Sequence, residues 1–284
     1  MPLNQPAWAP PGTNSEGQGR LTGGRRLSGN VYDASVRDSE GHVVLLHAFP
    51  LNAAMWRPQL QSAPPGWRIV TPDLPGFGAS AEPPATSMDT MAQTVLRAMD
   101  RLEIDRAVVG GLSMGGYVTL ALYRMAPDRF EGMILADTRA TADNDTQKDG
   151  RRKMLATVRD KGSAGVADGM LPKLLGPSSR QQRPELETQV RAMIESSSSA
   201  AIGAAVQALM DRADSTALLP SIAVPTLVLC GDEDELTPPA DAEALTAGIP
   251  GARLVLLPGA GHLSNLEAPD PFSRAVHDFL VTLR

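Results

Sequence analysis

One serine of this chain stands in a context suited to nucleophilic chemistry. Ser113 lies between Gly111 and Gly115, directly after an apolar run and directly before a stretch with helical spacing. In that spacing the serine would occupy a sharp turn from a strand into a helix, where close backbone contacts require small residues two positions before and after it. The free N–H groups at the start of such a helix can stabilise a developing oxyanion. The pattern predicts a nucleophile at Ser113; the simpler interpretation is an ordinary helix N-cap.

A serine nucleophile needs a base, and the base needs an acid that orients it. Of the four histidines, His262 follows the last apolar run in a glycine-rich loop, which is where parallel α/β folds place their chemistry. We therefore expect His262 to be the base. For the acid, four carboxylates stand together at 232–235, and Asp137 is a further candidate. The order serine, acid, histidine along the chain fits this type of site.

Alternating apolar runs and helix-length segments connect these residues. The apolar runs are short and rich in β-branched residues, as in strands buried on both faces of a sheet. They cover 42–46, 68–71, 107–109, 132–135, 226–229 and 253–257. Apolar residues recur at helical spacing over 88–102, 114–125 and 271–283. The alternation predicts an α/β fold with a mostly parallel central sheet flanked by helices.

The alternation stops over residues 138–222, which contain helical stretches but no strand-like run. Because this segment lies between two expected strands, we expect a helical lid inserted before the penultimate strand; a long crossover connection is the alternative. The α/β core then consists of residues 29–137 and 223–284. Residues 1–28 are rich in Pro, Gly, Asn and Gln, which predicts a disordered or loosely packed segment.

The composition is that of an ordinary globular protein. Of the 284 residues, 42% are hydrophobic and 20% are charged, and the formal net charge of −6 disfavours nucleic-acid binding. The single cysteine, Cys230, excludes an internal disulfide and a cysteine-based metal cluster. The sequence shows neither a secretory signal nor an apolar run of about 18 residues, so we expect a cytoplasmic protein without a membrane partner.

Several further motifs make residues 40–284 resemble the α/β-hydrolase family, in particular its bacterial carboxylesterases, 3-oxoadipate enol-lactonases and cofactor-free haloperoxidases. HAFP at 47–50 is similar to the family's HGFP, and DLPGFGAS at 73–80 is similar to the loop after its next strand. GLSMGG at 111–116 resembles the family's nucleophile turn, and Gly261-His262 resembles its histidine turn. Gly231-x-x-Asp234 followed by Thr237-Pro238 resembles its acid turn, which favours Asp234 over Asp232.

The resemblance implies a catalytic triad and two backbone amides that bind the oxyanion: Ser113, Asp234 and His262, with the amides of Phe49 and Met114. Ala48 departs from the family, which usually has glycine there, and an alanine is strained if the position needs a positive φ. Serine rather than aspartate at the nucleophile position disfavours epoxide and haloalkane hydrolysis. The sequence shows no nucleotide-binding glycine motif and no histidine–carboxylate cluster with metal-ligand spacing, so we expect no cofactor and no metal.

Residues and resemblance together predict a serine hydrolase that cleaves small to medium carboxylic esters or lactones through an acyl-enzyme. The same triad would serve a carbon–carbon bond hydrolase or a perhydrolase, and a non-catalytic binding protein on this scaffold is the alternative from another class. The expected partner is a small-molecule ester or lactone, and the expected assembly is a monomer or a homodimer.

The substrate pocket is expected to be apolar. Its candidate lining residues come from the core and from the expected lid: Trp56, Met170, Leu171 and Met193. Ordinary packing between lid and core explains the same residues, because methionine and leucine at helical spacing are common in cores. Arg139 follows an expected strand, where it would bind a substrate carboxylate or form a salt bridge with the lid.

Overall fold

The computed structural model describes residues 25–27, 31–34 and 39–284. In these residues eight strands form one sheet, in the order β1-β2-β4-β3-β5-β6-β7-β8. The six strands from β4 to β8 in that order run parallel, and β1 and β2 join them antiparallel. The strands are β1 Arg25–Leu27, β2 Val31–Ala34, β3 Gly41–Leu46, β4 Trp67–Pro72, β5 Ala107–Leu112, β6 Phe130–Ala136, β7 Thr226–Gly231 and β8 Arg253–Leu257. The expectation for residues 1–28 lies outside the described residues, apart from β1.

The central strands explain why the apolar runs do not alternate with polar residues. Strands β5 and β7 are buried along their whole length, because they have neighbours on both sides and helices over both faces. Strand β8 lies at the edge of the sheet and is partly exposed. Each of the six apolar runs forms one of the strands β3 to β8, so the predicted fold class, an α/β fold with a mostly parallel sheet, is confirmed.

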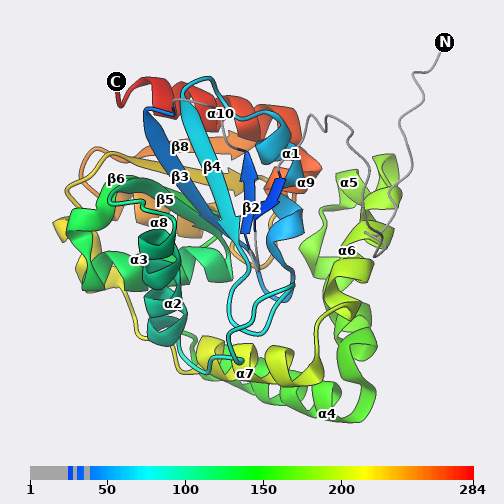
Figure 1. Ribbon diagram of the computed structural model, residues 1–284. Coiled ribbons are helices and arrows are strands. Elements are labelled where there is room, and N and C mark those ends of the chain that lie inside the picture. The colour runs from blue at the N-terminus through cyan, green and yellow to red at the C-terminus, as the bar shows by residue number, and fades with distance from the viewer. Residues whose placement is uncertain (1–24, 28–30, 35–38) are drawn as a thin grey trace, which may run out of the picture.

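Helices cover both faces of this sheet (Figure 1). Helices α2 (Met88–Arg101), α3 (Met114–Met125) and α8 (Pro239–Gly248) lie on one face. Helices α1 (Arg57–Gln61) and α10 (Pro269–Val281) pack together on the other, next to the short α9 (Ser264–Glu267). Helix α2 begins at the N-cap Ser87 and buries an apolar stripe that includes Met91, Val95 and Met99.

Four helices between β6 and β7 form what we call the helical insertion: α4 (Asp145–Leu174), α5 (Pro177–Gln182), α6 (Glu185–Glu195) and α7 (Ser199–Met210). Helices α4 and α7 lie side by side, beyond one end of the sheet (Figure 1). A capping box between Asn144 and Gln147 starts α4, and Gly162 breaks it with φ 63° and ψ −159°. In the described part of the chain no helix, α4 included, is both long and apolar enough to cross a membrane.

Candidate active site

Ser113 lies at the turn between β5 and α3 and has a strained backbone. Its φ of 55° and ψ of −113° are unusual for a residue with a side chain. The two flanking glycines are required by space. A Cβ on Gly111 would lie 2.2 Å from the backbone of Gly115, and a Cβ on Gly115 would lie 2.1 Å from the carbonyl oxygen of Leu46. Helix α3 and strand β3 therefore touch through their backbones, and this contact fixes the turn.

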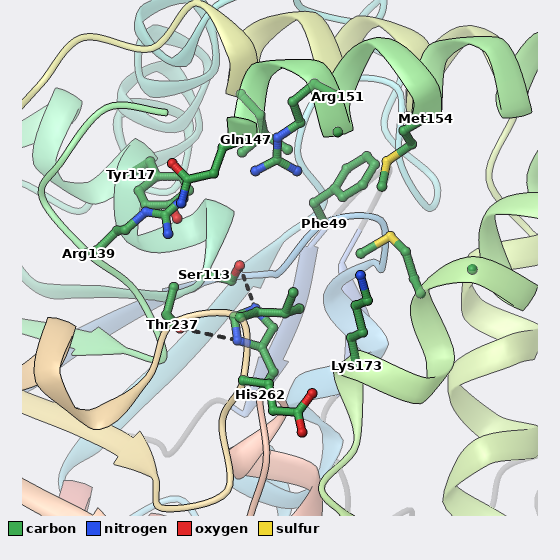
Figure 2. A pocket seen from close by; sticks show the side chains of 16 residues that line it. Phe49, Ser113, Tyr117, Arg139, Gln147, Arg151, Met154, Lys173, Thr237 and His262 are labelled. Atoms are coloured by element: carbon green, nitrogen blue, oxygen red, sulfur yellow. Dashed lines mark hydrogen bonds between the residues drawn. The ribbon is translucent and has the colours of Figure 1, made fainter. Parts of the chain in front are cut away.

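His262 connects Ser113 to a carboxylate. Its Nε2 lies 2.8 Å from the Ser113 Oγ, and its Nδ1 lies 2.8 Å from Oδ2 of Asp234 (Figure 2 shows the bond to Ser113). His262 is 3% exposed and Asp234 is 4% exposed, so the serine is the most accessible of the three. The structure thus brings together a nucleophile, a base and an acid from the ends of three different strands, with the geometry that nucleophilic catalysis needs.

The loop after β7 holds Asp234 with its charge facing the histidine. The amides of Leu236 and Thr237 donate to Asp234 Oδ1 at 2.8 and 3.0 Å, and the Thr237 hydroxyl donates to Oδ2 at 2.7 Å. Burial alone would raise the pKa of Asp234, but the charge and hydrogen bond of His262 and the bonds from Thr237 hold this pKa below its usual value. The ionised carboxylate can therefore orient and stabilise a protonated imidazole.

The other candidate acids bind elsewhere. Asp232 accepts the amide of Gly259, and Glu233 accepts the amide of Ser178. Asp137 accepts the amide of Gly231 and the hydroxyl of Ser264. Burial, and then the nearby charge of Asp234, raises the pKa of Asp137 well above its usual value. In this structure only Asp234, of the carboxylates proposed from sequence, forms a hydrogen bond with the imidazole of His262.

Three buried residues stand close enough together to share a metal ion: Asp137, Cys230 and Asp234. The donor set does not fit one. Both carboxylates already accept hydrogen bonds from backbone and side-chain donors. A cysteine ligand must be ionised, whereas burial and the two aspartates raise the pKa of the Cys230 thiol.

A buried histidine supports the loop after β3. The Leu74 amide donates to His47 Nε2 at 3.0 Å, so the ring proton lies on Nδ1, which is 3.0 Å from the carbonyl oxygen of Ala48. Burial lowers the pKa of His47, which keeps the ring neutral and both bonds intact. The three non-glycine residues with positive φ in the described part of the chain are Glu103, Ser113 and Asp137. Ala48 therefore fits this loop without the strain that its departure from glycine suggested.

Two backbone amides near Ser113 are available for a ligand. Those of Phe49 and Met114 form no hydrogen bond with any acceptor that the described residues provide. Met114 is the first residue of α3, so its amide belongs to the free N–H groups of the helix start. The Phe49 side chain lines the same cavity as Ser113. Of the two sequence-predicted oxyanion residues, Met114 directly follows the serine and Phe49 lines the same cavity.

Ser113 and His262 open onto a cavity of about 380 Å³ beneath α4. Both halves of the broken helix contribute to its wall: Gln147, Arg151 and Met154 from the first half, and Met170 and Lys173 from the second. Figure 2 shows the first three hanging from the helix above the serine, with Lys173 on the side of Phe49. The change of direction at Gly162 allows both halves of α4 to face the cavity.

Of the four predicted pocket residues, the structure brings only Met170 to this cavity. Trp56 is 1% exposed and packs against Phe272, with ring centroids 5.9 Å apart. Leu171 is 2% exposed and belongs to the core, and Met193 on α6 packs against the core. For Leu171 the correction follows from helix geometry, because its side chain points about 100° away from that of Met170 and into the core.

A buried carboxylate joins the insertion to the core beside the cavity. Asp143 accepts hydrogen bonds from Arg139 at 2.9 Å, Arg151 at 2.9 Å and Arg212 at 2.6 Å. Burial would raise the pKa of Asp143, but Arg151 and Arg212 hold it below its usual value. Arg139 therefore forms the salt bridge expected as one of its two roles, and it also lines the cavity.

A second carboxylate fixes the histidine loop. Glu267 accepts the amides of Gly176 at 2.8 Å, Gly261 at 2.9 Å and Leu263 at 3.0 Å. The last two residues flank His262 in sequence, and Gly176 follows the end of α4. The carboxylate of Glu267 thus holds together the loop that carries His262 and the segment that follows α4.

Sequence reasoning missed most of the polar cavity wall. Thr237 belongs to the acid-turn motif, but nothing in the motif assigned it the bonds to Asp234 and His262. Gln147, Arg151 and Met154 stand at helical spacing, which was a usable signal that they share one face. Their approach to the serine depends on tertiary packing, which spacing does not give.

Comparison with known proteins agrees with this fold. Residues 41–269 match the family model described as alpha/beta hydrolase fold. The chain is 28% identical over 235 residues to 3-oxoadipate enol-lactonase 2 of Acinetobacter baylyi, which covers 82% of this chain and 86% of that protein.

Two solved structures are similar along nearly their whole length. A thermophilic esterase from Thermogutta terrifontis, solved with malate bound, has a TM-score of 0.85 and 37% identity, covering 89% of this chain and 93% of that one. The enol-lactonase from Burkholderia xenovorans has a TM-score of 0.81 and 30% identity, covering 88% and 95%. With the family model matching most of its length, this chain belongs to the α/β-hydrolase family.

Proposed function

We propose that this protein is a serine hydrolase that cleaves carboxylic esters or lactones through an acyl-enzyme formed on Ser113. The observation that carries the proposal is the continuous line of hydrogen bonds from Ser113 Oγ through His262 to Asp234. The serine end of this line opens onto a cavity large enough for a small substrate. The similar proteins named as esterases and enol-lactonases support the same reaction class, because both cleave ester bonds.

In the proposed mechanism, His262 Nε2 takes the proton of Ser113 as its Oγ attacks the substrate carbonyl carbon. The amides of Phe49 and Met114 donate hydrogen bonds to the resulting oxyanion. The protonated His262 then gives its proton to the leaving alcohol oxygen, and the ester C–O bond breaks. Water repeats the sequence on the acyl-enzyme, which releases the acid and restores the serine.

The ionised Asp234 stabilises the imidazolium that forms in both steps, and the pKa shift described above keeps it ionised. The Thr237 hydroxyl lies 2.7 Å from Asp234 Oδ2 and 3.2 Å from His262 Nδ1, so it holds the carboxylate in line with the ring. We assign the helical insertion the role of a lid, because α4 supplies the wall of the cavity opposite the serine.

The test measures hydrolysis of p-nitrophenyl esters from acetyl to dodecanoyl by the wild type and by Ser113→Ala. Loss of the nucleophile is expected to lower kcat at least about 10³-fold with the fold intact. Ser62→Ala, an exposed serine at the end of α1, serves as the matched control and keeps wild-type activity.

Labelling with a fluorophosphonate provides an independent readout, since the reagent modifies an activated serine. Modification of the wild type but not of Ser113→Ala supports the proposal. A Ser113→Ala protein that retains most of its activity, or a folded wild type that neither hydrolyses any ester nor reacts with the reagent, contradicts it.

A further inference from the structure

The cavity wall carries an excess of positive charge in an acidic protein. Three cationic side chains line it, Arg139, Arg151 and Lys173, against one acidic residue, Glu235. The chain as a whole has a formal charge of −6. A cavity with walls of low dielectric concentrates the field of such charges, so an anionic ligand is attracted there and a cationic one is repelled.

The three cations are not equivalent. Arg139 and Arg151 share the buried carboxylate of Asp143, which offsets part of their charge. Lys173 is exposed and forms no ion pair or hydrogen bond with any of the described residues. Figure 2 shows its ammonium group directed into the cavity, on the side of Phe49. Its charge is therefore available to a ligand.

Arg139 adds a largely buried positive charge to the same wall. Its side chain is about nine-tenths buried, and its Nε is a buried polar atom without a hydrogen-bond partner. This atom has no surface open to the cavity, so Arg139 contributes its positive charge to the wall rather than a free donor. The apolar parts of the wall, Phe49, Met154 and Met170, can contact a hydrocarbon chain that extends from the serine into the cavity.

We propose that the preferred substrates are esters whose acyl group ends in a carboxylate, such as half-esters of aliphatic dicarboxylic acids, and that Lys173 is a specificity-determining residue for that carboxylate. The inference rests on the proposed function. Hydrolysis then adds water across the ester C–O bond and releases an alcohol and a dicarboxylate. Lysine suits this role because its long flexible stem lets one ammonium group reach carboxylates at different chain lengths.

The experiment compares monomethyl esters of dicarboxylic acids, from succinate to suberate, with esters in which a primary carboxamide replaces the free carboxylate. The two series have the same shape and differ in charge. Proton release in a pH-stat measures kcat/KM for each. The wild type is expected to favour the carboxylate over the amide by about tenfold or more at the best chain length, and added salt is expected to reduce this ratio.

Three variants assign the preference to a residue. Lys173→Met retains the length of the side chain without its charge and is expected to reduce the carboxylate-to-amide ratio about fivefold to tenfold; Lys173→Glu is expected to reduce it further. Lys161→Met is the matched control, because Lys161 is exposed on the same helix outside the cavity wall, and its ratio stays at the wild-type value.

The outcomes separate the two proposals. If the wild type hydrolyses carboxamide and carboxylate esters equally well, the charge preference is wrong and the esterase function stands. If the preference exists but survives in Lys173→Met, the assignment to Lys173 is wrong. If neither series nor the p-nitrophenyl esters are hydrolysed, the proposed function itself fails and the preference with it.

Discussion

The ends of the central strands and the helical insertion are built on different principles. At the strand ends, backbone touches backbone: a Cβ on Gly231 would lie 2.2 Å from the carbonyl oxygen of Ala260, as tight as the contacts of Gly111 and Gly115. In the insertion, Gly150 and Gly203 have nothing within 4 Å of an added Cβ. The reactive groups are therefore positioned by main-chain contacts that tolerate no added atom, whereas the wall facing them consists of replaceable side chains.

The largest expected effect comes from adding one methyl group to each region. Gly115→Ala forces a Cβ against the Leu46 oxygen and is expected to destabilise the fold by about 4 kcal/mol or more, with at least a 100-fold loss of esterase activity. Gly203→Ala, inside α7, is expected to stabilise the protein by up to about 1 kcal/mol, because alanine favours the helix. Urea unfolding measures both. Equal effects of the two substitutions would show that the strand ends and the insertion tolerate an added methyl group alike.

A smaller effect is expected where the two regions meet. Asp143→Asn removes the charge that Arg139, Arg151 and Arg212 share, which is expected to cost about 3 kcal/mol of unfolding free energy. The exposed pair of Asp168 and Arg191 provides the control, since Asp168→Asn is expected to cost less than about 1 kcal/mol.

The contribution of Asp143 to the free energy of unfolding is expected to depend on pH. Because the folded pKa of Asp143 lies below its unfolded value, its contribution is present above the unfolded value near pH 4 and is lost as the pH falls through the folded pKa. The wild type is therefore expected to lose more stability in acid than Asp143→Asn does. Parallel acid-unfolding curves would show that the carboxylate contributes no such linkage.

The effect expected at Asp137 is a slope of stability with pH rather than a single loss, and its sign is the reverse of that for Asp143. Its folded pKa is raised, so the folded state holds a proton that the unfolded state releases above about pH 4, and stability falls as the pH rises. Asp137→Asn keeps an acceptor for the Gly231 amide but cannot ionise. Denaturation between pH 5 and 8 is expected to show a wild-type slope steeper than that of the variant, by up to about 1.4 kcal/mol per pH unit. Identical slopes would mean that Asp137 titrates alike in both states.

Sequence reasoning was most successful where main-chain contacts decide the structure. The runs at 107–109 and 226–229 indicated strands buried on both faces, and the glycines around Ser113 indicated a turn with no space for a Cβ. Both signals are local, because a buried strand must be apolar and a close backbone contact must be glycine. The acid turn was harder. Four adjacent carboxylates have the same chemistry in sequence, and only the folded loop directs one of them to His262.

The cavity wall was the least predictable part. Met170 and Leu171 are neighbours of similar size and polarity, yet one faces the cavity and the other the core. Trp56 lies close in sequence to Phe49 but turns toward Phe272. These orientations depend on how the insertion docks on the sheet and on the break at Gly162, and both are set by long-range packing rather than by local preference.

Glu267 connects the end of α4 rigidly to the loop that carries His262. Its two oxygens accept the amide of Gly176 and the amides on either side of His262. Moving the C-terminal end of α4 away from the core would therefore leave a buried carboxylate without these donors and would displace the base. The segment before Gly162 has no such tether to the histidine loop among the described contacts. The end of α4 and the loop that carries His262 are therefore held in one fixed relation, so the wall near Lys173 keeps its distance from the reactive groups.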